Sequence, residues 1–496
     1  MDKKPEYLQH RLEKLKVLRE QGINPYPYKY DKTHGSTEIL DNFEKLSETE
    51  TKVRYAGRVI SVRGHGKTMF AHLGDNNGKL QIYARKDILD DNFSIMKKID
   101  IGDFIGVEGS VFKTKTGETT VRAETVTLLA KSLRPLPEKW HGLQDKELRY
   151  RRRYLDLIVN PEVKDVFIKR AKIIREIREF LDKRGFIEVE TPVLQPIYGG
   201  AAAKPFVTHH KALDIDLYLR IADELYLKRL IIGGFEKVYE MAKDFRNEGM
   251  DKHHNPEFTM LEFYWAYADY NDLMEMLEEL YRHLAKTIIG AEQFPFGEHS
   301  IDFGKKFARI SYMRSITHVC GYDLIDMTED ELKVLAKKHE INTDDFKGRG
   351  DYFDAFFSYF IEPYLIQPTF VMDYPIELSP LAKTHRDDPR LTERFELFIA
   401  GFEFGNAFSE LNDPQDQRQR MIQQSKLLER GHEEAQPVDE DFIFALEHGM
   451  PPTAGYGIGV DRIAMLLTNS PSIRDIILFP TMKPEVKNDA EDLSDE

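Results

Sequence analysis

Residues 244–264, DFRNEGMDKHHNPEFTMLEFY, place an arginine, glutamates, a histidine pair and an aromatic side chain close together in the chain. Apolar residues before and after them predict strands over residues 241–245 and 257–264, joined as an antiparallel hairpin by a long polar loop. The rim of such a loop could grip a nucleotide with Arg246, Glu248, His254 and Asn255. The alternative is a solvated hairpin tip, which we favour less because Arg246 directly follows the apolar Phe245.

A second arginine, Arg462, stands in GYGIGVDRIAMLL, where glycines run directly into an apolar helix pattern. Chemistry at a nucleotide phosphate depends on positioning and on cations placed at the charged oxygens. The planar guanidinium of Arg246 suits a bidentate grip that lysine could not copy. A lone glycine-rich turn is weak evidence, but a second arginine beside it fits the same nucleotide site.

Two carboxylates, Glu396 and Glu403, lie seven residues apart in RFELFIAGFEFGNAFSELND. Hard cations such as Mg²⁺ prefer oxygen ligands and share them with nucleotide phosphates. The spacing places both groups on one face of a helix, or on opposite faces of one unbroken strand, and Gly401 would permit a bend or two strands. The spacing alone decides nothing, and a solvated pair of glutamates fits it equally well.

The bulk composition indicates a soluble globular protein of two or three domains. The chain has 496 residues, with 41% hydrophobic and 31% charged residues, and single cores rarely exceed about 250–300 residues. A single cysteine, Cys320, excludes a disulfide framework and a cysteine-based zinc site. The first residues lack the apolar core of a signal peptide, and no apolar run is long enough for a membrane span. We therefore expect a cytoplasmic protein without a membrane partner.

Charge is distributed unevenly along the chain. The net charge is −15, but residues 51–150 carry 18 Lys/Arg against 12 Asp/Glu. A basic module on an acidic body fits a protein that contacts a polyanion in one place only.

The elements that must position these groups follow from the apolar spacing. Residues 6–22 have the spacing of an amphipathic helix. Five short alternating runs between residues 53 and 129 predict a small β-barrel, with the oligonucleotide-binding OB-fold as our interpretation and another small barrel as the alternative. Residues 163–181 have helical spacing, and FIEVETPVL, residues 186–194, alternates like a strand that Pro192 restricts to an edge or interface.

Nearly the whole chain resembles the class II lysyl-tRNA synthetases of the compact, bacterial-like form. The segments that carry the resemblance include RPLPEKWHGLQDKELRYRRRYLDLI, ETPVLQPIYGGAAAKPF, LYLRIADELYLKRLIIGGFEKVYE, NAFSELNDPQDQ and the two arginine segments above. The resemblance implies an α+β fold: an N-terminal OB-fold β-barrel, and a class II catalytic domain whose antiparallel sheet is flanked by helices. Two departures are Lys204, where the family usually has arginine, and the additional His253.

The resemblance also implies domain bounds. It predicts an N-terminal helical segment over residues 1–50, an anticodon-binding barrel over 51–132, a linker over 133–160, a catalytic domain over 161–487 and an acidic tail over 488–496. Motif 1, which forms the dimer interface in the family, corresponds to residues 163–195, motif 2 to residues 238–264 and motif 3 to residues 455–467.

Residue roles are carried over from the family. ATP binding is assigned to Arg246, Glu248, His254, Asn255, Phe258 and Arg462, with the two arginines catalytic. In this assignment Arg462 covers adenine opposite Phe258 and, with His254, contacts the β/γ-phosphates. Mg²⁺, with up to three ions per active site, is assigned to Glu396 and Glu403. The lysine-binding residues are Gly200, Glu224, Glu262, Tyr264, Asn406 and Glu410.

A lysine pocket must compensate an ammonium group that has left water, so paired carboxylates are needed. Glu262 and Glu410 would face the ε-ammonium beside Tyr264, and Glu224 the α-amino group. An aspartate-selecting relative would need a cation there, so the acids favour lysine over aspartate. Arginine would have to be excluded by pocket length and by the geometry at Tyr264.

On the barrel, the resemblance assigns anticodon contacts to Phe70, Gln81, Glu118 and Arg63. Phe70 would stack on the central uridine and Gln81 would bond its edge. Without the resemblance, Phe70 would fit a barrel core and Arg63 a solvated charge.

The expected protein is a homodimer whose partners are ATP, L-lysine and tRNA(Lys). Two alternatives are a paralogue that attaches lysine to a protein, which lacks the barrel, and an RNA-binding protein built on an inactive synthetase. The second would have lost Arg246, Arg462, Glu396 or Glu403, and all four are present.

Overall fold

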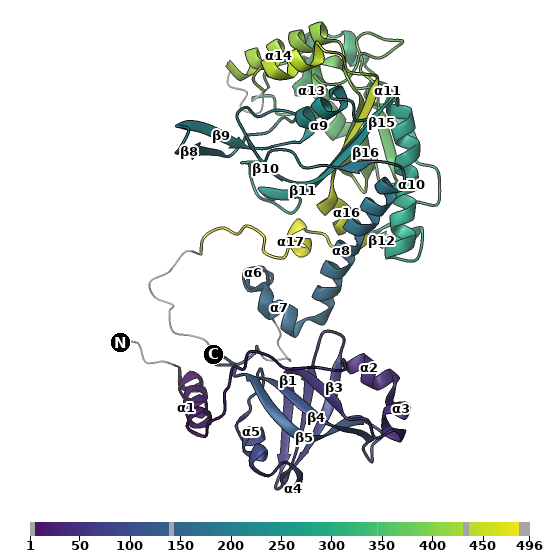
Figure 1. Ribbon diagram of the computed structural model, residues 1–496. Coiled ribbons are helices and arrows are strands. Elements are labelled where there is room, and N and C mark those ends of the chain that lie inside the picture. Colours follow the sequence, from purple (N-terminus) through teal and green to yellow (C-terminus); the bar gives the residue numbers. More distant parts are fainter. Residues whose placement is uncertain (1–4, 138–142, 345, 430–435, 486–496) are drawn as a thin grey trace. The chain divides into compact units, whose positions relative to one another are not determined.

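The computed structural model describes residues 5–137, 143–344, 346–429 and 436–485 (Figure 1). The chain divides into two units, Met1–Gln144 and Asp145–Glu496. The division falls inside the linker expected over residues 133–160, of which residues 138–142 lie outside the described part. The acidic tail expected over residues 488–496 also lies outside it.

The first unit contains a closed five-stranded barrel in the order β1-β2-β3-β5-β4. Its strands are β1 (Val53–His65), β2 (Thr68–Gly74), β3 (Lys79–Arg85), β4 (Phe104–Lys113) and β5 (Thr119–Ala130). Alternate residues such as Leu80, Ile82 and Ala84 point into the core and are buried, as the period of two in a strand requires. All five predicted runs form strands, and the predicted OB-type barrel is confirmed.

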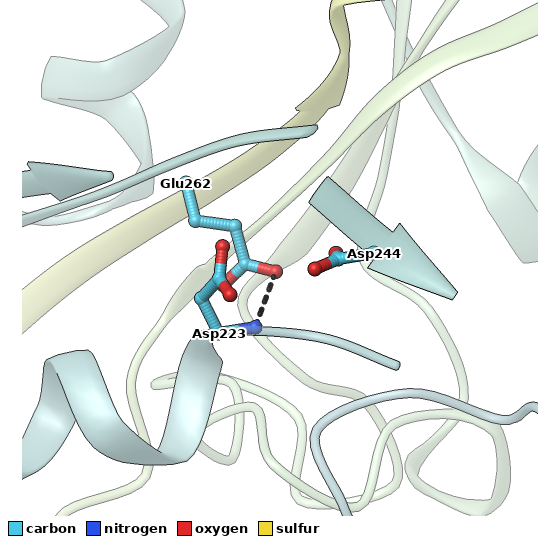
Figure 2. Close-up of side chains that lie close together, drawn as sticks. All are labelled: Asp223, Asp244 and Glu262. Atoms are coloured by element: carbon cyan, nitrogen blue, oxygen red, sulfur yellow. Dashed lines mark hydrogen bonds between the residues drawn. The ribbon is translucent and has the colours of Figure 1, made fainter. Parts of the chain in front are cut away.

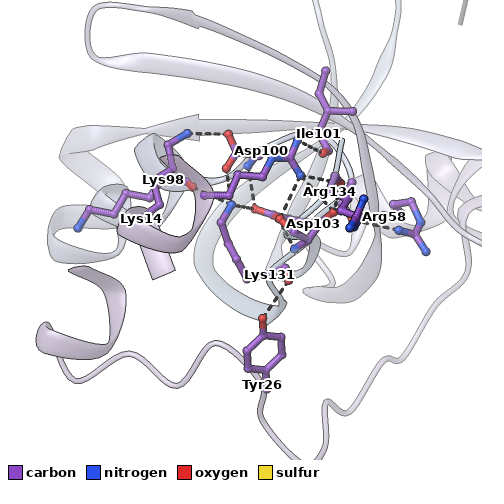
Figure 3. A network of polar contacts seen from close by, with 12 residues as sticks. Lys14, Tyr26, Arg58, Lys98, Asp100, Ile101, Asp103, Lys131 and Arg134 are labelled. Carbon is purple, nitrogen blue, oxygen red and sulfur yellow. Dashed lines mark hydrogen bonds and ion pairs between the residues drawn. The ribbon is translucent and has the colours of Figure 1, made fainter. Parts of the chain in front are cut away.

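Short helices surround this barrel: α1 (Glu6–Glu20), α2 (Ser36–Asp41), α3 (Phe43–Glu48), α4 (Lys86–Leu89), η1 (Asp90–Asn92) and α5 (Phe93–Lys98). The predicted N-terminal helix is α1, and Arg11 ties it to the barrel by donating to the carbonyls of Ile101 and Ser132. Beside it, the fully buried Lys131 ammonium pairs with Asp100 at 2.5 Å and Asp103 at 2.7 Å (Figure 3).

The second unit is built on an eight-stranded sheet in the order β14-β15-β16-β17-β18-β11-β10-β6. The strands are β6 (Ile187–Glu188), β10 (Lys237–Phe245), β11 (Glu257–Ala266), β14 (Ala308–Ser311), β15 (Thr369–Met372), β16 (Arg394–Ile399), β17 (Phe402–Ser409) and β18 (Thr453–Gly459). The pairs from β15 to β10 are antiparallel, whereas the outermost pairs, β14–β15 and β10–β6, are parallel. This arrangement confirms the predicted antiparallel catalytic sheet.

Helices α8 (Pro161–Asp182), α10 (Tyr270–Ile288) and α16 (Val460–Leu467) share one hydrophobic core with this sheet. A second core joins α11 (Tyr312–Cys320), α12 (Glu329–Lys338) and α13 (Arg349–Phe360), and a third joins α9 (Glu224–Ile232) and α15 (Glu440–Leu446) to β11. The other elements are α14 (Pro414–Glu429), α17 (Ile473–Ile476), β7 (Leu194–Gln195), β8 (Val207–His210), β9 (Ile215–Leu219), β12 (Gln293–Phe296), β13 (His299–Asp302), η2 (Leu324–Asp326), η3 (Glu362–Tyr364) and η4 (Ile376–Leu378).

Local predictions hold with one exception. The predicted hairpin is β10–β11, in which Asp244 lies opposite Phe258, and the predicted helix over residues 163–181 is α8. The continuous strand predicted over residues 186–194 is wrong: only the two residues of β6 join the large sheet, and β7 pairs with β9. Thr191 donates its N–H to Glu240 at 3.1 Å instead of to a strand, and Pro192 has no N–H to donate.

The expected linker contains two helices, α6 (Lys146–Arg151) and α7 (Arg153–Val159). They belong to the larger unit, because Tyr150 donates to Asp475 at 2.8 Å and the buried Arg153 donates to the Arg474 carbonyl at 2.6 Å. Across the described ranges, no helix has both the length and the apolar character needed to cross a bilayer.

Candidate active site and barrel surface

One cavity of about 420 Å³ lies against β11, β16, β17, β18, the loop between β10 and β11 and the first turns of α9 and α16. All fourteen residues predicted for the active site line it: Gly200, Glu224, Arg246, Glu248, His254, Asn255, Phe258, Glu262, Tyr264, Glu396, Glu403, Asn406, Glu410 and Arg462. Residues more than 260 positions apart in the chain therefore meet at one site.

The hairpin places Arg246 directly after β10, with its guanidinium 5.1 Å from the centre of the Phe258 ring. Its hydrogen bonds to the Ile221 carbonyl are long, 3.4 Å from both Nε and Nη2, so the guanidinium can exchange them for an anionic ligand. The loop is organised by Asp251, which accepts the N–H of His254 at 2.8 Å and pairs with its ring. Burial opposes ionisation of Asp251, but hydrogen bonds from His254 and from backbone N–H groups lower its pKa to about 2. Sequence reasoning missed Asp251, although its position three residues before His254 is typical of a local cap.

Glycines in β18 leave room for the side chains opposite them. A Cβ at Gly455 would overlap both the Glu410 carboxylate and the Tyr264 ring. Beyond the strand, Arg462 in the first turn of α16 donates to the Glu403 carbonyl and lies 3.5 Å from its carboxylate. The second predicted arginine is therefore beside one of the two predicted metal ligands.

Glu396 and Glu403 lie on neighbouring antiparallel strands, so the open question about their spacing is settled by the fold. The turn between the strands uses left-handed backbone at Ala400 (φ 55°) and Gly401 (φ 78°). These two carboxylates on adjacent strands offer oxygen donors that fit a hard cation. The Glu403 side chain is 40% exposed.

Sequence reasoning missed the two groups that support Glu396. Arg394 pairs with it at 2.5 Å and Tyr374 donates to it at 2.8 Å. Burial raises the pKa of Glu396 to about 7, with Arg394 acting against the rise and Glu403 adding to it. The signal for Arg394 was present, because residues two apart on a strand share a face.

The other end of the cavity is acidic. Glu224, Glu262 and Glu410 are each at most 5% exposed, and Tyr264 donates to Glu262 at 3.2 Å. Asn406 is held there by Arg394, which donates to its carbonyl oxygen at 3.0 Å. The two residues that depart from the family pattern, His253 and Lys204, also lie near the site. The His253 ring contacts Phe402, and the Lys204 carbonyl accepts the Asn247 N–H.

Behind Glu262 lies an acidic cluster that the sequence did not reveal. Asp223, Asp244 and Glu262 each bring a carboxylate oxygen within 4.8 Å of the others (Figure 2). Among the described residues, no other group of three or more His, Cys, Asp or Glu side chains has ligand atoms this close. Arg220 supplies positive charge, 3.0 Å from Asp223 and 3.4 Å from Asp244.

Burial raises the pKa of all three carboxyl groups, that of Asp244 to about 6. Neighbouring charges add to the rise at Asp223 and at Glu262, whereas Arg220 and Arg246 act against it at Asp244. The negative charges around Glu262 are therefore incompletely compensated, which is the condition that favours binding of a cationic group.

On the barrel, the predicted nucleic-acid contacts lie on one outer face. Phe70 pairs in register with Arg63 on one side and Tyr83 on the other. Phe70 is outside the buried core and its ring lies 4.8 Å from that of Tyr83, so it does not fill the barrel interior. Sequence reasoning missed Tyr83 and Phe112, whose rings, 5.8 Å apart, extend this aromatic surface.

Gln81 is held by two hydrogen bonds. It donates to Glu118 at 2.7 Å and accepts from Thr120 at 2.9 Å, which fixes the orientation of its amide. Glu118 also contacts His72 at 2.8 Å. The predicted pair Gln81 and Glu118 thus forms one polar patch beside the aromatic surface.

Two family models match the two units. "tRNA synthetases class II (D, K and N)" matches residues 145–483, and "OB-fold nucleic acid binding domain" matches residues 53–129. The lysine–tRNA ligase of Carboxydothermus hydrogenoformans is 55% identical, over 97% of this chain and 98% of its own. Those of Thermoanaerobacter pseudethanolicus and Enterococcus faecalis are 54% and 53% identical, over 98% and 95% of this chain and 97% and 96% of theirs. The chain belongs to the class II tRNA synthetases and, within them, to the lysine–tRNA ligase family.

Proposed function

We propose that this protein activates L-lysine with ATP to lysyl-adenylate and then transfers lysine to the 3′ end of tRNA(Lys). The observation that carries the proposal is the division of one cavity into two ends. The end at Arg246 and Phe258 can hold a nucleotide, and the end at Glu224, Glu262 and Glu410 is acidic and can hold ammonium groups.

In the activation step, the lysine carboxylate attacks the α-phosphorus and pyrophosphate leaves. Arg246 would hold the carboxylate and the α-phosphate together, which the exchangeable hydrogen bonds of its guanidinium support. Phe258 and Arg462 would hold adenine between an aromatic face and a guanidinium plane. Glu248 and Asn255 would hold the adenine edge, and His254 and Arg462 the β/γ-phosphates. A phosphate oxygen can accept the proton in the transfer step, so we assign no protein general base.

Mg²⁺ would be held by Glu396 and Glu403, whose oxygen donors fit it. When bound, it would neutralise charge on the phosphate oxygens. We propose up to three ions per active site, by analogy with the family, and the exposed carboxylate of Glu403 supports access from the cavity. Arg394 and Tyr374 would hold Glu396 in position.

Lysine would be selected by charge and by shape. Glu262 and Glu410 would receive the ε-ammonium beside Tyr264, Glu224 the α-ammonium, and Asn406 and Gly200 would complete the pocket. The left-handed backbone of Gly200 (φ 91°) lies close to Glu224, since a Cβ there would be 3.1 Å from the Glu224 Cβ. A larger residue at position 200 would therefore crowd the α-ammonium site.

The barrel would read the anticodon with Phe70 as the stacking surface and Gln81 and Glu118 as edge contacts; Arg63 would contact a phosphate or base. The fixed amide of Gln81 and the partly exposed ring of Phe70 support these roles. Stacking contributes about 1–3 kcal/mol per base.

We further propose a cytoplasmic homodimer that pairs through motif 1. Apolar side chains there are exposed in the single chain: Ile168 is 55% exposed, Ile187 52% and Leu194 46%. Ile187 lies in β6, the last strand of the sheet. An exposed apolar sheet edge favours pairing with another chain.

Aminoacylation tests the proposed function directly. The purified protein should attach radiolabelled lysine to tRNA(Lys) in an ATP-dependent reaction, and a transcript with a changed central anticodon base should be charged poorly. Attachment of lysine to a protein instead of tRNA would favour the paralogue, and no transfer at all would favour a non-catalytic role.

A further inference from the structure

A buried lysine, Lys228, lies behind the acidic end of the cavity. It stands one helical turn after Glu224 on α9, and its Nζ lies 2.5 Å from the Glu224 carboxylate and also pairs with Glu410. The Lys228 side chain is fully buried. Glu224 and Glu410 line the cavity whereas Lys228 does not, so its ammonium contacts the two carboxylates from the side away from the cavity.

This arrangement sets the charge of the pocket. A buried ammonium is tolerated only when it is paired, and here the two partners come from different elements, α9 and the residue that follows β17. When all three cavity glutamates are ionised, as lysine binding would favour, the one internal ammonium leaves two net negative charges at this end. Lysine has two ammonium groups, so the pocket charge matches that of the groups it would receive.

Lys228 is also the group that favours the ionised form of Glu410. Burial raises the pKa of Glu410 and the charge of Glu224 adds to the rise, whereas Lys228 lowers it. Other groups near Glu410 are Tyr264 and Glu262 on β11, and on β18 the Gly455 backbone and the Thr453 carbonyl, which accepts the Glu410 N–H at 2.8 Å. Burial acts to lower the pKa of Lys228, but its two carboxylate partners raise it above the ordinary value, so Lys228 carries its charge at neutral pH.

We propose that Lys228 is a positioning residue of the amino-acid pocket, whose ammonium orients Glu224 and Glu410 to receive the two ammonium groups of lysine. The inference rests on the proposed function. Burial outweighs this internal cation and raises the pKa of Glu410 to about 8 even with Lys228 present. Without Lys228 the pKa would be higher still, and lysine binding would have to displace a more tightly held proton. Lysine binding would then become weaker, and its pH dependence would move to higher pH.

The test is Lys228→Met in the full-length protein, assayed by lysine-dependent ATP–pyrophosphate exchange. The KM for lysine at pH 7 should rise about tenfold or more, as expected when a buried charge loses its partner. The KM for ATP and the kcat should change much less. Because the pKa of Glu410 is about 8 and Lys228 lowers it, the KM for lysine should fall as the pH rises in both proteins, and the fall should lie at higher pH in the variant than in the wild type.

Lys131→Met is the matched control. Lys131 is also a fully buried ammonium between two carboxylates, but it lies in the barrel unit (Figure 3). Its removal should lower the unfolding temperature and leave the KM for lysine unchanged. If Lys228→Met does not fold, Lys228→Gln, which keeps hydrogen-bond donors without the charge, should show the same rise in KM and the same pH dependence.

A folded Lys228 variant with the wild-type KM for lysine would overturn the inference. So would an equal loss in kcat and in both KM values with the pH profile of the wild type, because that pattern indicates a purely structural role. If the wild-type protein itself shows no lysine-dependent exchange, the proposed function fails, and this result is separate from any effect at Lys228.

Discussion

Replacing Glu262 by glutamine should separate lysine binding from folding. Glu262 is 5% exposed, accepts a hydrogen bond from Tyr264 at 3.2 Å and a long one from the Asp223 N–H at 3.4 Å. Glutamine has the same shape: its amide oxygen can accept from the Asp223 N–H, and its NH2 can donate to the Tyr264 hydroxyl where the second carboxylate oxygen accepted. The substitution therefore removes one negative charge and little else.

The magnitude follows from the burial of the site. Loss of one partner of a buried, hydrogen-bonded charge pair costs about 2–5 kcal/mol, so the KM for lysine should rise roughly 30- to 4,000-fold. The KM for ATP should stay near the wild-type value, because Arg246 and Phe258 are unchanged. ATP–pyrophosphate exchange at varied lysine concentration measures both constants.

The same substitution should stabilise the empty protein. Burial, together with the charges of Glu224 and Asp244, raises the pKa of Glu262, so the ionised carboxylate destabilises the folded state at neutral pH. The unfolding temperature of Glu262→Gln should exceed that of wild type at pH 7.5, and the difference should vanish towards pH 4, where the unfolded chain also becomes protonated.

A matched control lies on the same strand. Glu257 begins β11 and its side chain is 55% exposed, so Glu257→Gln should change neither the KM for lysine nor the unfolding temperature. An unchanged KM in folded Glu262→Gln would refute the pocket assignment, and a lowered unfolding temperature would refute the electrostatic reasoning.

Three further substitutions test other parts of the site. Asp244→Asn removes a buried carboxyl whose pKa is raised to about 6; the free energy of unfolding should rise by up to about 3 kcal/mol above pH 6, and thermal unfolding should show the gain shrinking between pH 6 and pH 4. Gly455→Ala would push a methyl group into Glu410 and Tyr264; overpacking of about 1–3 kcal/mol predicts a KM for lysine roughly 5- to 150-fold higher in the exchange assay, with ATP binding retained. Phe70→Ala removes a stacking surface on the barrel; kcat/KM for charging tRNA(Lys) should fall roughly 5- to 150-fold, while exchange without tRNA stays at the wild-type rate. A wild-type result in the respective assay would contradict each assignment.

Much of the fold could be predicted because it depends on local patterns. The barrel strands alternate apolar and polar residues between Gly, Asp and Asn turns, and β10 and β11 flank a long polar loop. The strand predicted through Pro192 failed for a reason that the local pattern could not reveal. Thr191 bonds to Glu240, a residue 49 positions away, and this contact replaces the expected strand pairing.

In the candidate site too, local patterns could be predicted, whereas contacts between distant residues could not. The fourteen cavity residues could be predicted because they stand in recognisable segments. The spacing of Glu396 and Glu403 could not distinguish a helix from two strands, since the turn at Gly401 depends on the neighbouring strands. Lys228 was missed because its pairing with Glu410 joins residues 182 positions apart, although the i,i+4 spacing from Glu224 was a visible signal.

The central claim is that the acidic end of the cavity selects lysine, and amino-acid-dependent ATP–pyrophosphate exchange tests it most directly. Purified protein should be compared with lysine, arginine and norleucine, whose unbranched side chain lacks the ammonium. We predict exchange with lysine, weak exchange with arginine, and a kcat/KM roughly 10⁴-fold lower for norleucine, because buried charged groups would be left unpaired. No exchange with lysine, or equal exchange with arginine or norleucine, would contradict the account.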